Sequence, residues 1–267
     1  MALVAQVKAA SLVAPDETAY DLFQIFRHSR GSCLPCFDDH LPASVLAGLV
    51  VLHGDTASGK SVLLRNILAT HLLPASCGGH GLPSVLIDAD QSFDLWLLAK
   101  LLQDKAKRAG CGEGVSEVEE SLERLVVCRP LEPLELLQQL SDLRQTFALK
   151  PRAALLVVDS MSAWQSMTAA FPRSSGAVLK ECWKALSRLQ EEASLSVLIA
   201  HREGFQLDFE LKDVIHLGIG CCPVDENSET ECFYLAPWDR MPASGTERTF
   251  FVVSPAGGVL TVSPQPQ

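Results

Sequence analysis

One glycine-containing segment constrains the fold of this chain more than any other feature. It consists of Gly54, Asp55, Thr56, Ala57, Ser58, Gly59, Lys60 and Ser61. An apolar run at 46–53 precedes it and a helical pattern at 62–72 follows it, so the segment is predicted to join a buried strand to a helix. In such a turn the backbone N–H groups and the helix N-terminus face a polyphosphate. The spacing therefore predicts a phosphate-binding loop, with a structural glycine turn as the alternative.

The last two residues of this loop carry the expected ligand chemistry. Lys60 is expected to reach the β- and γ-phosphates of ATP, and the Ser61 hydroxyl is expected to ligate Mg²⁺. ATP and Mg²⁺ are therefore the predicted cofactors, with residues 54–61 as the binding segment.

Strand-like and helical patterns alternate along the chain after residue 45. Apolar runs typical of strands lie at 46–53, 84–88, 124–128, 153–159 and 195–200, and helical patterns lie at 62–72, 93–107, 132–147 and 176–193. This alternation predicts right-handed crossovers and an α/β fold, a mostly parallel sheet with helices on both faces. Short strands at 214–220, 232–236, 248–253 and 259–262 predict antiparallel C-terminal additions at one edge of the sheet.

These patterns divide the chain into three parts. Residues 1–45 are expected to be an entry segment with one short helix at 18–28, and the role of its Cys33 and Cys36 pair stays open. Residues 46–262 form the predicted ATP-binding domain. The Pro/Ser/Gln-rich tail at 263–267 is expected to be disordered.

Charge and cysteine content narrow the function classes. The 267 residues carry a formal net charge of −10, whereas proteins that hold nucleic acid alone usually present a basic face. The nine cysteines are scattered through apolar segments, which favours reduced thiols over a disulfide framework. No apolar run approaches the length of about 20 residues that spans a bilayer, so no membrane partner is expected.

Two further strand-like runs end in acids. Asp159 follows an apolar run and is expected to hold Mg²⁺ through water, the Walker B role. Asp88 ends the run at 84–88, and Asp90 follows two residues later. In ATPases with an additional strand between the phosphate loop and Walker B, a carboxylate here polarises the attacking water, so Asp90 is the candidate catalytic residue. The alternative is that Asp88 and Asp90 cap the following helix.

Together these three segments resemble the core of RecA-type recombinases. Within that fold, residues 90–94 and the closing strands at 248–259 resemble a eukaryotic recombinase paralogue, and the similarity covers residues 40–262. The resemblance implies a RecA-like P-loop ATPase core in a nuclear heteromeric complex with other recombinase paralogues. It also implies a role in homologous-recombination repair of DNA double-strand breaks, with single-stranded or branched DNA contacted through the complex.

Departures from active recombinases predict weak or absent ATP hydrolysis. Asp90 stands where those enzymes usually carry Glu, and a carboxylate withdrawn by about 1 Å can cost roughly 10²-fold in rate. His201 and Arg202 follow the last core strand, where a polar amide senses the γ-phosphate in recombinases. The next segment, 203–213, carries four acids against Lys212 and would repel a DNA backbone. In the segment after Walker B, Trp164 and Phe171 are candidates for stacking on DNA bases, with core packing as the alternative.

Three other functions stay open on the sequence. The first is an active, DNA-stimulated RecA-type ATPase that works alone or as a homo-oligomer. The second is a P-loop small-molecule kinase, although the arginine-rich lid of such kinases is not found. The third is an interaction module that keeps the fold without binding nucleotide.

Overall fold

The computed structural model describes residues 48–149, 155–164, 175–193, 195–202, 214–223, 231–237, 249–253 and 259–263. The predicted entry helix at 18–28, the Cys33 and Cys36 pair and the tail after 263 lie outside these residues. The loop segments at 165–174 and 203–213 lie outside them as well.

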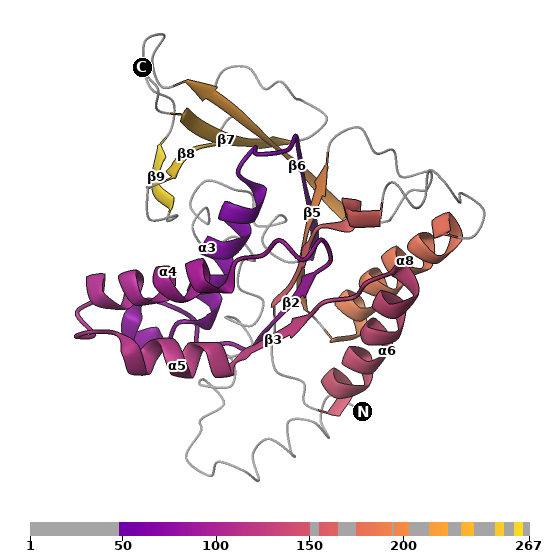
Figure 1. Cartoon of the computed structure of the whole chain (residues 1–267), viewed down its shortest axis with the longest axis horizontal. Helices are drawn as coiled ribbons and strands as arrows, with labels where there is room; N and C mark the ends of the chain where they lie inside the picture. The colour runs from indigo at the N-terminus through magenta and orange to yellow at the C-terminus, as the bar shows by residue number, and fades with distance from the viewer. Residues whose placement is uncertain are drawn as a thin grey trace.

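A nine-stranded sheet forms the centre of the domain (Figure 1). Its strands follow the order β3-β2-β4-β5-β1-β6-β7-β8-β9. Their bounds are β1 Leu49–Gly54, β2 Ser84–Asp88, β3 Leu125–Cys128, β4 Leu155–Asp159, β5 Ser196–Arg202, β6 Val214–Pro223, β7 Glu231–Pro237, β8 Thr249–Val253 and β9 Val259–Ser263.

The first six strands in this order run parallel, as the alternation of strands and helices predicts. The sequence prediction is wrong for β6, which pairs parallel with β1 instead of opening the antiparallel edge. The antiparallel additions begin one strand later, with β7, β8 and β9. The α/β class and the RecA-like core are confirmed.

Helices cover both faces of the sheet (Figure 1). One face carries α3 Lys60–Leu72, α4 Leu95–Arg108 and α5 Val115–Glu123, and the other carries α6 Pro133–Leu149 and α8 Ser175–Ala193. Two short 3₁₀ turns, η3 Ala75–Cys77 and η4 Met161–Trp164, complete the described helical elements.

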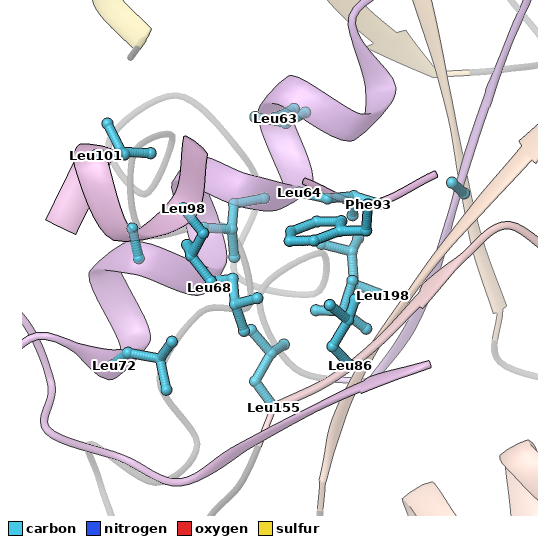
Figure 2. Packing of buried hydrophobic residues seen from close by; sticks show 14 of the residues in the cluster. Leu63, Leu64, Leu68, Leu72, Leu86, Phe93, Leu98, Leu101, Leu155 and Leu198 are labelled. Carbon is cyan, nitrogen blue, oxygen red and sulfur yellow. The ribbon is translucent and has the colours of Figure 1, made fainter. Parts of the chain in front are cut away.

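Two apolar clusters hold these layers to the sheet. On the α3 and α4 side, leucines such as Leu68 and Leu98 pack with Phe93 and the inward side chains of the strands (Figure 2). On the other side, fully buried Trp183 is among the largest side chains packed between α8 and the sheet. The predicted helical faces at 62–72, 93–107 and 176–193 are therefore confirmed as core faces.

One cysteine pair departs from the expected reduced state. Cys77, in η3, and Cys111, after α4, form a disulfide with their Cα atoms 6.7 Å apart. The two residues are 34 positions apart in the chain, and only the packing of α4 beside α3 brings them together. Among the described residues, Cys128 and Cys182 are free thiols.

Candidate functional site

The loop at 54–61 joins β1 to α3 as the sequence predicts. Its backbone is tightly turned: Gly59 has a φ of 90°, and Ala57 also has a positive φ of 64°. A Cβ on Gly54 would lie 2.5 Å from Ser58 Oγ and 2.7 Å from the Ile219 carbonyl oxygen. Only glycine fits at position 54 without displacing these neighbours.

Lys60 places its ammonium inside this loop. Its Nζ donates to the carbonyl oxygens of Gly54 at 2.8 Å and Asp55 at 2.6 Å, and to Ser58 Oγ at 3.2 Å. No side chain caps the start of α3, and the first turn of α3 contains no acid. The N-terminal end of the helix therefore keeps its positive potential toward the loop.

Asp159 ends β4 and faces the same loop. In the sheet, β5 lies between β4 and the strand β1 that precedes this loop. The Ser61 side chain, at the start of α3, nevertheless interacts with this carboxylate and lowers its pKa. Asp159 is 2% exposed, and its Oδ2 has no hydrogen-bond partner among the described residues.

The surroundings of Asp159 favour its protonated form. The pKa of Asp159 is raised to about 6, mainly by burial, while the Ser61 side chain opposes this shift. The nearby carboxylates of Asp90 and Asp88 raise this pKa further, while Lys60 lowers it. A cation beside Oδ2 would relieve this unfavourable negative charge.

These residues fit a hydrated Mg²⁺ ion. Mg²⁺ usually keeps several waters and takes only one or two protein oxygens besides phosphate. Ser61 and the unpartnered Asp159 oxygen supply such a pair. Larger metal-binding groups of three or more His, Cys, Asp or Glu are absent from the part of the chain that the structure describes.

Asp88 is a structural carboxylate. It is fully buried, its Oδ1 accepts the Phe93 N–H at 3.2 Å, and its Oδ2 accepts Arg129 Nε at 2.9 Å. Neither Asp88 nor Asp90 caps the following helix, so that alternative is wrong. Asp94 caps α4 instead, by accepting the N–H groups of Trp96 at 2.9 Å and Leu97 at 3.1 Å.

Asp90 lies exposed in the connection between β2 and α4. Its Oδ1 accepts the Ser92 N–H at 3.1 Å and the Ser92 hydroxyl at 2.8 Å. The ends of β2 and β4 are joined by the Ala89 N–H, which donates to the Asp159 carbonyl at 2.8 Å. Asp90 and Asp159 therefore occupy the same end of the sheet as the phosphate loop.

Three histidines on neighbouring strands form a row below the loop. His53 Nε2 lies 2.7 Å from His216 Nδ1, and the rings of His53 and His201 meet edge to face with centroids 5.6 Å apart. Burial lowers the pKa of His53 to about 3, with His201, His216 and Lys60 lowering it further. Neither His53 nor His216 was predicted from the sequence, where the signal of each was a single polar residue inside an apolar strand run.

The end of β5 contacts the segment that follows β4. Ser162 Oγ lies 3.2 Å from His201 Nδ1 and accepts the Arg202 N–H at 2.7 Å. Trp164, one of the two aromatic residues considered for DNA stacking, is buried and donates Nε1–H to the Leu131 carbonyl at 3.1 Å. Core packing therefore explains Trp164, while Phe171 lies outside the described residues.

Sequence similarity to a known protein supports this RecA-like geometry. No protein-family model matches the chain. DNA repair protein XRCC2 of Mus musculus is 28% identical to it over 147 residues, which are 54% of this chain and 51% of the mouse protein. The chain resembles a RecA-type recombinase paralogue. The predicted resemblance, most of all to the second X-ray-repair cross-complementing protein, is confirmed by this relative.

The match to the mouse protein extends over only part of each chain. The chain spans about half the length of the curated relative it matches.

As for membranes, none of the helices in the described ranges is both long enough and apolar enough to cross a bilayer.

Proposed function

We propose that this protein is an ATP-binding subunit of a heteromeric recombinase-paralogue complex that acts in homologous-recombination repair of DNA double-strand breaks. ATP serves mainly as a structural ligand, with weak or no hydrolysis. The buried Asp159 carboxylate beside Ser61 carries the proposal, because its Oδ2 has no hydrogen-bond partner among the described residues and lies at the loop that would hold the phosphates.

ATP occupies the loop at residues 54–61 in this proposal. The phosphates replace some of the acceptors that hold Lys60 Nζ, and the loop N–H groups donate to phosphate oxygens. Ser61 ligates Mg²⁺ directly and Asp159 binds it through water. The phosphates of ATP then neutralise the charge of Lys60, and Mg²⁺ neutralises the charge of Asp159, at this end of the sheet.

Weak hydrolysis follows from how the two candidate reaction groups are held. The short Asp90 side chain already accepts two hydrogen bonds from Ser92. At the end of β5, His201 is fully buried and faces Ser162 instead of presenting an amide to a γ-phosphate. Neither arrangement favours activation of an attacking water.

The cellular role rests on the resemblance. The mouse relative is described as a DNA repair protein, and recombinase paralogues work in the nucleus as heteromeric assemblies. Other paralogues are the proposed partners of this chain. The net charge of −10 supports contact with single-stranded or branched DNA through those partners.

Thermal unfolding of the full chain tests nucleotide binding. A ligand at about 100 times its Kd stabilises the folded state by about 2.7 kcal/mol. MgATP is therefore expected to raise the Tm of the wild-type protein and to leave Lys60→Ala unchanged, with Lys180→Ala on the exposed face of α8 as a charge-matched control. No shift in the wild type would leave an interaction module without nucleotide.

Turnover and co-purification test the rest of the proposal. The wild-type protein is expected to hydrolyse ATP slowly or not at all, and tagged protein is expected to recover other recombinase paralogues. Rapid hydrolysis by the isolated chain, lost in Asp90→Ala, would establish the active ATPase instead.

A further inference from the structure

Arg65 is a buried cation that the proposed ATP site does not use. It lies on α3 one helical turn after Ser61 and is only 8% exposed. Its Nε is buried and has no hydrogen-bond partner among the described residues. Burial of a charged group is unfavourable unless neighbouring groups compensate for it.

Two of the compensating groups come from the connection between β2 and α4, and a third ends β4. The Arg65 guanidinium lies over the Phe93 ring, with Cζ 5.4 Å from the ring centroid. Burial lowers the pKa of Arg65, and the carboxylates of Asp94 and Asp159 act in the opposite direction. A cation over an aromatic face contributes more when both groups are removed from water.

Phe93 is the anchor of this connection. Its ring belongs to the apolar cluster between the helices and the sheet (Figure 2). Its N–H donates to the buried Asp88 carboxylate, and the next residue, Asp94, caps α4. The position of Phe93 therefore determines where residues 89–92 lie, Asp90 among them.

We propose that Arg65 is a positioning residue, whose guanidinium clamps Phe93 and so fixes the connection that holds Asp90 beside the phosphate loop. Because Arg65 and Ser61 lie on the same side of α3, one helix carries both the loop that binds phosphate and the clamp that positions Asp90. The importance of this clamp for nucleotide rests on the proposed function, whereas the clamp itself does not.

Hydrogen exchange of the full chain without nucleotide tests the clamp. The reporters are the N–H groups of Ser92, Phe93, Trp96 and Leu97, which the structure protects through aspartate side chains. Arg65→Met keeps the volume of the side chain but removes its charge. It is expected to speed exchange in a peptide covering residues 88–97 about tenfold, and to leave exchange in α8 unchanged, because the connection loses the group that lies over Phe93.

Two further variants complete this test. Arg65→Lys keeps the charge without the planar group and is expected to show an intermediate exchange rate, and it serves if Arg65→Met fails to fold. Arg108→Gln removes an exposed charge at the other end of α4 and is expected to exchange like the wild type. Wild-type exchange in both Arg65 variants would overturn the inference.

A MgATP arm separates this inference from the proposed function. Wild-type protein is expected to gain protection in the same peptide on addition of MgATP, and Lys60→Ala is not. If the wild type gains none, nucleotide binding fails while the nucleotide-free exchange still decides the role of Arg65. If the wild type is protected and Arg65→Met exchanges normally without nucleotide, the clamp alone is wrong.

Discussion

Arg129 donates from Nε to the fully buried Oδ2 of Asp88 at 2.9 Å. Arg129 follows β3 and Asp88 ends β2, so the pair joins the carboxyl ends of two neighbouring strands. The Arg129 side chain is half-exposed, whereas the carboxylate is removed from water. Asp88 therefore depends on this arginine and on the Phe93 N–H for its compensation.

Arg129→Met is expected to destabilise the protein by roughly 3 kcal/mol, because a buried carboxylate loses its charged partner. Urea unfolding measures the change. Arg144→Met is the matched control, since Arg144 pairs with Glu192 on the surface, where an ion pair contributes about 0–1 kcal/mol. Equal effects of the two substitutions would contradict the structural role of Asp88.

Asp159→Asn is expected to stabilise the protein at pH 7.5 in the absence of Mg²⁺. The folded-state pKa of Asp159 is raised from 3.8 to about 6, so the folded state binds the proton more tightly than the unfolded state does. Stability is therefore lost as the pH rises through this window, and at pH 7.5 the ionised carboxylate costs about 3 kcal/mol.

The gain from Asp159→Asn should shrink at pH 5, where the wild-type carboxyl is largely protonated. Urea midpoints at the two pH values give the comparison, with Glu119→Gln on the exposed face of α5 as the control. A gain that does not depend on pH would show that burial of the charge is not its cause. Asp159→Asn should also lose the Mg²⁺-dependent part of any stabilisation by ATP.

Acidification is expected to destabilise the protein through the histidine row. The folded-state pKa of His53 is lowered from 6.5 to about 3, so between these values the unfolded chain binds a proton that the folded chain does not. Stability therefore falls as the pH is lowered through 6.5. His53→Gln should make the pH dependence of the urea midpoint shallower between pH 7 and pH 5, and an unchanged slope would argue against this role.

Gly54→Ala is expected to lower both stability and nucleotide binding. The added Cβ would lie 2.7 Å from the backbone oxygen of Ile219, and such overpacking costs about 1–3 kcal/mol. Gly176→Ala is the control, because nothing lies within 4 Å of a Cβ there and the residue is in helix α8. That change should stabilise by about 0.5–1 kcal/mol, as measured by thermal unfolding.

Much of the fold was predictable from local patterns. The runs at 84–88 and 124–128 became β2 and β3 with little change in their bounds, and the glycine-containing loop joins a strand to a helix as its neighbours required. The pairing of β6 was not predictable in the same way. A short apolar run predicts a strand, but parallel or antiparallel pairing depends on the connection that precedes it.

The candidate site, like the fold, was only partly predictable from local patterns. Residues 54–61 and Asp159 were predicted as site residues from their positions in strands and turns, and the tertiary structure brings Ser61 close enough to Asp159 to lower its pKa. Asp88 was recognised as an acid at the end of a strand, but its partner Arg129 follows another strand, β3. Arg65 and the histidine row left no periodic signal, because single polar residues inside apolar runs look like interruptions.

The sequence by itself determined the strand–loop–helix segment around residues 54–61, the alternation of strands and helices, and the acids that end two strands, because burial periodicity and turn chemistry act over a few residues. Only the tertiary structure decided that β5 lies between β1 and β4, that Cys77 meets Cys111, and that Arg65 covers Phe93. Those relationships depend on how crossovers bring distant segments together, and no local pattern of residues records that.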